Sequence, residues 1–235
     1  MLRFHTQVAG VSLTAQQPLN NIARVTIQAL AAVCGGTQSL HTNSYDEALG
    51  LPTEESATVA LRTQQIIAEE SGVANIVDPL GGSHLVEMLT DEIYNLSLRK
   101  IDEIENLGGA LKAVEAGFQQ KEIHESAWNH MQKVESNERK IVGVNHGILD
   151  EEEMPPVLKP DPDLGIKQKQ KLAALRANRD QENVDKCLDA IYTASKGEDN
   201  LFPLVIDALK NDCTLGEIIG AMKKEFGTYM APSGF

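Results

Sequence analysis

The sequence predicts an α/β fold in which parallel strands alternate with helices, followed by a purely helical C-terminal part. Two short segments of alternating character, 3–9 and 37–43, are each followed by a long run with apolar residues at helical spacing. A stretch rich in acidic residues and proline begins near residue 150. Beyond it, the pattern is that of amphipathic helices alone.

Composition narrows the class of protein before any motif is considered. The chain has 235 residues, and 21 Lys and Arg against 34 Asp and Glu give it a net charge of −13. This acidic balance argues against a nucleic-acid surface and against a polybasic membrane contact. No window approaches the roughly 20 apolar residues of a membrane span, and the first residues lack the pattern of a signal peptide. The three cysteines are widely spaced, which favours a reducing compartment, and we expect a cytoplasmic protein.

The N-terminal segment predicts two consecutive β-α units. A strand over 3–9 is followed by a helix over 14–34, and a strand over 37–43 by a helix over 54–71. The residues expected to cap these helices are Thr14 and Thr53. Connection rules then make the two strands parallel and adjacent. A strand so close to the first residue also leads us to expect further chain before it.

The next segment predicts mainly helices. A loop rich in turn residues, 77–83, precedes a helix over 85–107, and a second helical stretch over 110–137 is interrupted near Gly117. The short apolar run 140–145 predicts a third strand. We therefore expect a first domain over 1–148 with two or three strands.

The remaining sequence predicts a linker and a helical tail. The linker is expected over 149–164, where acidic residues and prolines gather, and the tail over 165–235. The helices expected in the tail cover about 165–179, 181–195, 199–211 and 214–227. Thr214 with Glu217 three residues later predicts a capping box for the last one.

No complete catalytic motif is present, and the six histidines lack the spacing of metal ligands, so we expect no metal site. The two predicted strands are nevertheless polar on one face. The residues on this face are His5 and Gln7 in the first strand, and Ser39, His41 and Asn43 in the second. Such a face either contacts a polar ligand or forms a network that satisfies itself, and the residues alone leave both possibilities open. Gly10 and Gly50, each just past a strand or its loop, are positions where backbone could approach a flat group closely.

The segment 5–53, and especially GGTQSLHTNSYDEALGLPT within it, resembles the catalytic chain of the methylmalonyl-CoA mutase family, which are adenosylcobalamin-dependent acyl-CoA mutases. The resemblance continues through SATVALRTQQIIAEESGV, VDPLGGS, IVGVN and TLGEIIGAMKKEFG, so it covers almost the whole chain. It implies the C-terminal part of a (β/α)8 TIM barrel, followed by an α-helical extension.

The resemblance also implies an isomerase that rearranges a carbon skeleton by radical chemistry, with (R)-methylmalonyl-CoA to succinyl-CoA as the first candidate reaction. Mutases of isobutyryl-, 2-hydroxyisobutyryl- or ethylmalonyl-CoA, and a non-catalytic scaffold that docks to an intact mutase, are the alternatives. The family's catalytic chain is about twice as long, and no counterpart of its catalytic residues or axial histidine is found here. The resemblance therefore implies inactivity without two partners, the N-terminal half of the barrel and a cobalamin-binding domain or small subunit that supplies the axial histidine.

The resemblance also implies roles for individual residues of this chain. The positions expected to contact the corrin of adenosylcobalamin are Gly10, Glu47 and Gly50. The positions expected to line the acyl-CoA channel are Gln38 and Ser39, together with His5, Gln7 and His41. All lie at or near strand segments, and the ends of barrel strands are where such enzymes build their sites.

Overall fold

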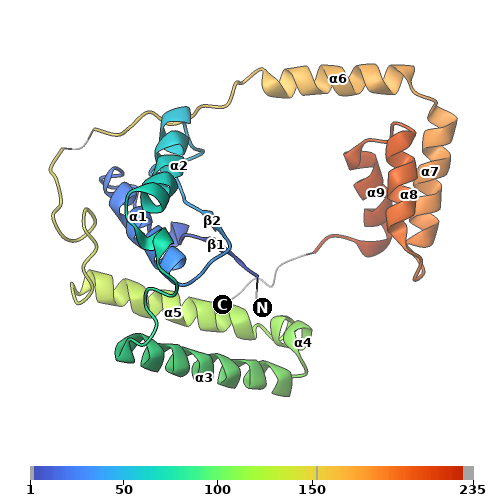
Figure 1. Ribbon diagram of the computed structural model, residues 1–235. Helices are drawn as coiled ribbons and strands as arrows, with labels where there is room; N and C mark the ends of the chain where they lie inside the picture. Colours follow the sequence, from blue (N-terminus) through green and yellow to red (C-terminus); the bar gives the residue numbers. More distant parts are fainter. Residues whose placement is uncertain (1–2, 152, 230–235) are drawn as a thin grey trace. The chain divides into compact units, whose positions relative to one another are not determined.

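The computed structural model describes residues 3–151 and 153–229. The chain forms two compact units, 1–158 and 159–235, which we call the N-terminal and C-terminal units (Figure 1). The predicted linker 149–164 crosses the boundary between them, and the division into domain, linker and tail stays a prediction. Glu152 of the predicted acidic run and the last six residues of the predicted tail lie outside the described residues.

The sheet of the N-terminal unit consists of two parallel strands, β1 (His5–Gln7) and β2 (Ser39–His41). The register pairs His5 with Ser39 and Gln7 with His41. Because side chains alternate along a strand, these four lie on one face, and all four are exposed. The predicted parallel and adjacent strands are confirmed, and the molecule is mostly helical with a small parallel sheet, consistent with the α/β class.

Two helices pack beside this sheet, α1 (Asn20–Cys34) and α2 (Glu54–Glu69) (Figure 1). Apolar residues recur every three or four positions along both helices and therefore face the same core. The buried members of this core are Val8, Leu13, Val25, Ala29 and Ile67. Burial of this cluster fixes the strands, and hence their polar face, against the helices.

The predicted cap of α1 is wrong. Gln17 has a left-handed backbone with φ of 48°, which prevents the helix from extending back to Thr14. The hydroxyl of Thr14 instead donates to the carbonyl of Gln16 at 2.8 Å. A short 3₁₀ helix (Gly10–Ser12) follows β1, and α1 begins only at Asn20.

The cap of α2 is confirmed, because the hydroxyl of Thr53 accepts the N–H of Ser56 at 3.2 Å. We expect Thr53→Ala to lower the free energy of unfolding by about 1 kcal/mol, the typical value of an N-cap. Urea unfolding followed by circular dichroism would measure it. Thr58→Ala, an exposed change within the same helix, is the control, and an equal loss in both variants would contradict a capping role.

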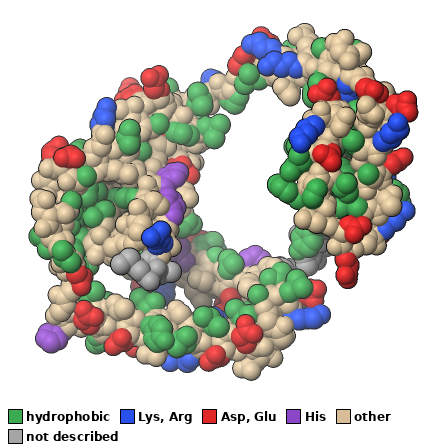
Figure 2. All heavy atoms as spheres, turned by 45° about the vertical axis from the view of Figure 1, so that its right-hand side comes forward, with side chains coloured by type: hydrophobic (Ala, Val, Ile, Leu, Met, Phe, Trp, Pro, Cys, Tyr) green, Lys and Arg blue, Asp and Glu red, His purple; other side chains and the backbone are tan. Residues whose placement is uncertain are grey.

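Three further helices continue the N-terminal unit: α3 (His84–Asn106), α4 (Ala110–Glu115) and α5 (Phe118–Glu135). The predicted interruption is confirmed at Gly117, whose φ of 74° favours glycine. Neither α3 nor α5 has a fully buried residue, and their apolar side chains lie on the surface (Figure 2). No helix in the described ranges combines the length and apolar character needed to cross a bilayer.

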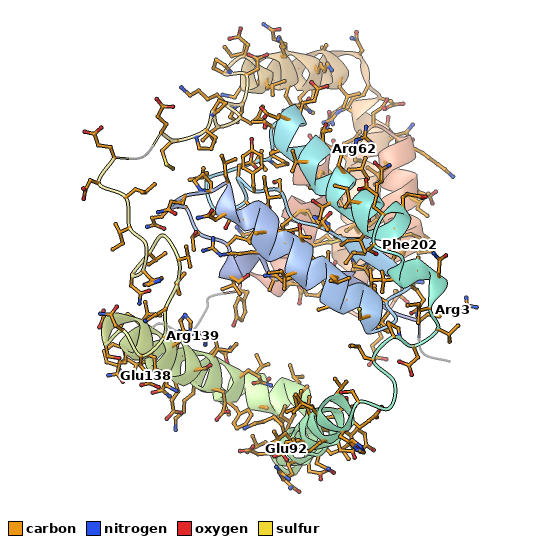
Figure 3. All side chains as sticks on the ribbon, turned by 60° about the vertical axis from the view of Figure 1, so that its left-hand side comes forward. Arg3, Arg62, Glu92, Glu138, Arg139 and Phe202 are labelled. Carbon is orange, nitrogen blue, oxygen red and sulfur yellow. The ribbon has the colours of Figure 1, made fainter. Side chains whose placement is uncertain are left out.

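The predicted third strand over 140–145 is wrong. The side chain of Asn145 accepts the N–H of Ile141 at 2.6 Å and donates to the carbonyls of Val134 and Arg139. Gly143 has φ of 85°, so the segment folds into a tight turn with one isolated bridge instead of a strand. Figure 3 shows Arg139 where the chain leaves α5 for this turn.

The C-terminal unit is entirely helical over its described residues: α6 (Leu164–Asn178), α7 (Gln181–Ala194), α8 (Leu201–Lys210) and α9 (Leu215–Phe226). The four predicted helices are confirmed, as is the capping box of Thr214 and Glu217. The buried core of this unit is Val184, Ile191, Ala208, Cys213, Ile218 and Ala221.

Candidate functional site

A groove of about 560 Å³ lies along the polar face of the sheet and the start of α2. Four of the predicted site residues line it together: His5, Gln7, His41 and Glu47. Apolar side chains of α2, including Leu61, complete its wall. Residues from two strands and a helix thus meet in one concave surface, as is typical of ligand sites.

Some side chains of the polar face form hydrogen bonds with one another. Nδ1 of His5 lies 2.7 Å from the hydroxyl oxygen of Ser39, and the side-chain amide of Gln7 donates to Oδ1 of Asn43 at 3.1 Å. Within the described part of the chain, no hydrogen bond of the His41 side chain is found. The network is therefore present in two pairs, and contact of this face with a ligand stays a prediction.

Asn43 is the functional candidate that sequence reasoning did not select, although it lies on the polar face. It is 2% exposed, and its Nδ2 donates to the carbonyl of Val8 at 3.2 Å. A Cβ placed on Gly10 would lie 2.9 Å from this Nδ2 and 3.8 Å from Oε1 of Glu47. Gly10 and Glu47, both predicted to contact the cofactor, are therefore neighbours, and Gly10 also lies against Asn43.

The turn over 44–50 carries Glu47 and is held from beneath by a buried carboxylate. Oδ2 of Asp46 accepts the N–H of Thr53 at 3.2 Å, and Asp46 is 1% exposed. Burial raises the pKa of this carboxyl, but the nearby hydroxyls of Ser44 and Ser56 and the N–H of Thr53 outweigh it and leave the pKa below its usual range. A second tie comes from α1, where Nδ2 of Asn21 donates to the carbonyl of Tyr45 at 2.8 Å.

The remaining predicted residues lie outside the groove. A Cβ on Gly50 would lie 2.9 Å from Cγ1 of Val157, so a side chain of the predicted linker covers this glycine. Oε1 of Gln38 accepts the N–H of Phe4 at 2.7 Å, which ties the strands together. Gln38 and Ser39 line a separate hollow of about 350 Å³.

The groups that line the groove are suited to binding a ligand through hydrogen bonds. Its polar groups are amides, imidazoles, hydroxyls and one carboxylate, which donate or accept hydrogen bonds. In the described ranges, no cluster of three or more His, Cys, Asp or Glu is suited to a metal ion. A side chain at Gly10 would meet Nδ2 of Asn43 at 2.9 Å, so this position stays free of a side chain beside the exposed Glu47 carboxylate. Contact of Gly10 with a corrin stays a prediction.

Comparison with known proteins identifies the chain's relatives. The family model of methylmalonyl-CoA mutase matches residues 1–228. A probable mitochondrial methylmalonyl-CoA mutase of Caenorhabditis elegans is 50% identical over 233 residues, which are 98% of this chain and 31% of that protein. The methylmalonyl-CoA mutase of Escherichia coli (strain K12) is 44% identical over 234 residues, covering 99% of this chain and 33% of that protein.

A relative named for a different substrate is also found. The 2-hydroxyisobutanoyl-CoA mutase large subunit of Aquincola tertiaricarbonis is 43% identical over 230 residues, which are 97% of this chain and 41% of that protein. The chain thus spans about a third of the length of the methylmalonyl-CoA mutases it matches. Because the family model covers almost all of it, the chain belongs to the methylmalonyl-CoA mutase family and corresponds to a portion of the catalytic subunit.

Proposed function

We propose that the chain supplies part of the catalytic subunit of an adenosylcobalamin-dependent acyl-CoA mutase, with (R)-methylmalonyl-CoA and succinyl-CoA as the reacting pair. The observation that carries the proposal is the groove in which His5, Gln7, His41 and Glu47 meet beside Gly10. Family membership supports the reaction class, and the polar character of the groove supports a ligand with many hydrogen-bonding groups.

The chain's own residues bind and orient in this proposal. Gly10, Glu47 and Gly50 contact the corrin, with the Glu47 carboxylate accepting hydrogen bonds from corrin amides. The acyl-CoA is contacted by His5, Gln7, Gln38, Ser39 and His41. Bound adenosylcobalamin supplies the cobalt–carbon homolysis that starts the rearrangement. For Gly50 this assignment requires Val157 to move aside, because its side chain lies against that glycine.

The proposal extends to what surrounds the chain. β1 and β2 are two adjacent strands of a (β/α)8 barrel whose other strands come from a further N-terminal segment, and a cobalamin-binding domain or small subunit provides the axial histidine. The Aquincola tertiaricarbonis relative is named a large subunit, which supports such a division. The free cysteines support a reducing compartment, and we propose the cytoplasm.

Reconstitution tests the proposal. The isolated chain should not interconvert methylmalonyl-CoA and succinyl-CoA, whereas mixing it with the N-terminal barrel segment, a cobalamin-binding domain and adenosylcobalamin should produce turnover. The mixture without this chain is the control. Turnover by the isolated chain, or no turnover in the full mixture with any acyl-CoA of the family, would overturn it.

A 2-hydroxyisobutanoyl-CoA mutase is the second candidate, favoured by 43% identity to the large subunit of such an enzyme. Supplying both acyl-CoA substrates to the same reconstituted mixture distinguishes the two by the ratio of kcat/KM. A non-catalytic scaffold would instead bind an intact mutase in a pull-down and add no turnover to the complementary segments.

A further inference from the structure

Asp46 is the one buried acidic side chain among the described residues, with 1% of its surface exposed. Removing a carboxylate from water is costly unless hydrogen bonds compensate. Its Oδ2 has a partner, but Oδ1 has no hydrogen-bond partner within the described ranges. A buried carboxylate with one oxygen that lacks a partner among the described residues calls for a reason beyond filling space.

Asp46 closes the turn with its backbone and joins the turn to α2 with its side chain. Its backbone carbonyl accepts the N–H groups of Leu49 at 2.8 Å and Gly50 at 3.1 Å, which closes the turn. Its side chain accepts the N–H of Thr53, the N-cap of α2. A carboxylate at a helix N-terminus is also favoured by the helix dipole. One residue therefore anchors the turn on α2.

The neighbour of Asp46 depends on this anchor. Glu47 is exposed, and no hydrogen bond of its side chain is found among the described residues, so the position of its backbone sets the region that the carboxylate can reach. That backbone brings Oε1 to 3.8 Å from the position of a Cβ on Gly10. A shift of the turn would separate the two and open the edge of the groove.

We propose that Asp46 is a positioning residue, which holds Glu47 beside Gly10 through the bond of its side chain to Thr53, while its backbone carbonyl closes the turn onto Leu49 and Gly50. This inference rests on the proposed function for the role of Glu47, but the anchoring itself is a property of the chain alone. Asp46 is buried within the turn and does not line the groove, so its proposed role is to position Glu47.

Hydrogen exchange of the whole chain without any ligand tests the anchoring. Asp46→Ala should speed exchange of the turn's amides, including those of Leu49 and Gly50, roughly tenfold, because the bond to Thr53 is lost. Asp46→Asn keeps an acceptor and should show a smaller rise. Asp91→Asn, an exposed change on α3, is the matched control and should leave the turn unaffected.

The amides of α1 separate positioning from general destabilisation. If exchange over α1 rises as much as over the turn in both variants, or if the turn is unchanged in both, the proposal is overturned. If Asp46→Ala unfolds the unit, Asp46→Asn decides, since its smaller rise must still be confined to the turn.

Reconstituted enzyme provides the functional readout. The adenosylcobalamin concentration for half-maximal activity should rise about tenfold in Asp46→Asn, with an unchanged KM for acyl-CoA. Equal changes in both constants, or in neither, would contradict positioning of Glu47. If the wild-type mixture has no activity at all, the proposed function fails, whereas the exchange result on the chain alone still decides the anchoring.

Discussion

Glu217→Gln should destabilise the C-terminal unit by about 2 kcal/mol, because it removes the charge from the most buried ion pair in the described part of that unit. Arg179 binds both carboxylate oxygens of Glu217, with Nη1 to Oε2 at 2.7 Å and Nη2 to Oε1 at 2.8 Å. The side chains are 4% and 22% exposed, so solvent screens the pair poorly. Glu217 also completes the cap of α9, since Oε2 accepts the N–H of Thr214 at 2.8 Å.

The same carboxylate predicts a dependence on pH. The Arg179 hydrogen bonds hold the pKa of Glu217 far below its usual range, although partial burial opposes this. A lowered folded-state pKa means that the stabilisation is complete above the unfolded value near 4.3 and is lost as the pH falls below it. The wild type should therefore lose stability more steeply than Glu217→Gln between about pH 4 and pH 2.

Urea unfolding at several pH values measures both effects. Glu182→Gln is the control, because Glu182 forms an exposed pair with Lys186 in the same unit. Such exposed pairs contribute between about 0 and 1 kcal/mol. Arg179→Met should also be destabilising, and the double variant should lose less than the sum of the two single changes. Additive losses, or parallel pH curves for wild type and Glu217→Gln, would exclude a coupled pair.

Helices were the part of this fold that local sequence could predict. The capping box of Thr214 and Glu217 and the break at Gly117 are decided within a few residues of chain, and both are confirmed. The strand predicted over 140–145 failed, because its branched residues favour a strand but Gly143 and the side chain of Asn145 close a turn. A single asparagine that makes three hydrogen bonds outweighs a weak strand propensity.

Local sequence likewise predicts one part of the candidate site but not the other. Alternation along the strands predicted that His5 and Gln7 share a face, and the register confirms that Ser39 and His41 join them. The bond from Gln7 to Asn43 joins residues 36 positions apart, and it depends on the strands lying side by side. No local pattern reports such a contact, so the sequence predicts Asn43 as a polar residue of this face but does not predict its bond to Gln7.

Gly10→Ala should damage both the fold around the groove and its ligand binding. The new Cβ would lie 2.9 Å from Nδ2 of Asn43, closer than packing allows. Asn43 is buried and bonded to Val8 and Gln7, so moving its amide breaks these bonds. We expect a loss of about 1 to 3 kcal/mol in unfolding free energy, as for other overpacked sites.

Ligand binding should also weaken, because Gly10 is a proposed corrin contact and Gln7 loses its partner Asn43. In reconstituted enzyme, we expect the adenosylcobalamin concentration for half-maximal activity to rise at least about tenfold, the result of losing roughly 1.4 kcal/mol of binding free energy. Gly35→Ala is the control, since its Cβ would lie 3.4 Å from the nearest atom. If Gly10→Ala binds cobalamin as tightly as Gly35→Ala does while its stability falls, the glycine serves only the packing of Asn43, and the corrin contact must lie elsewhere in the groove.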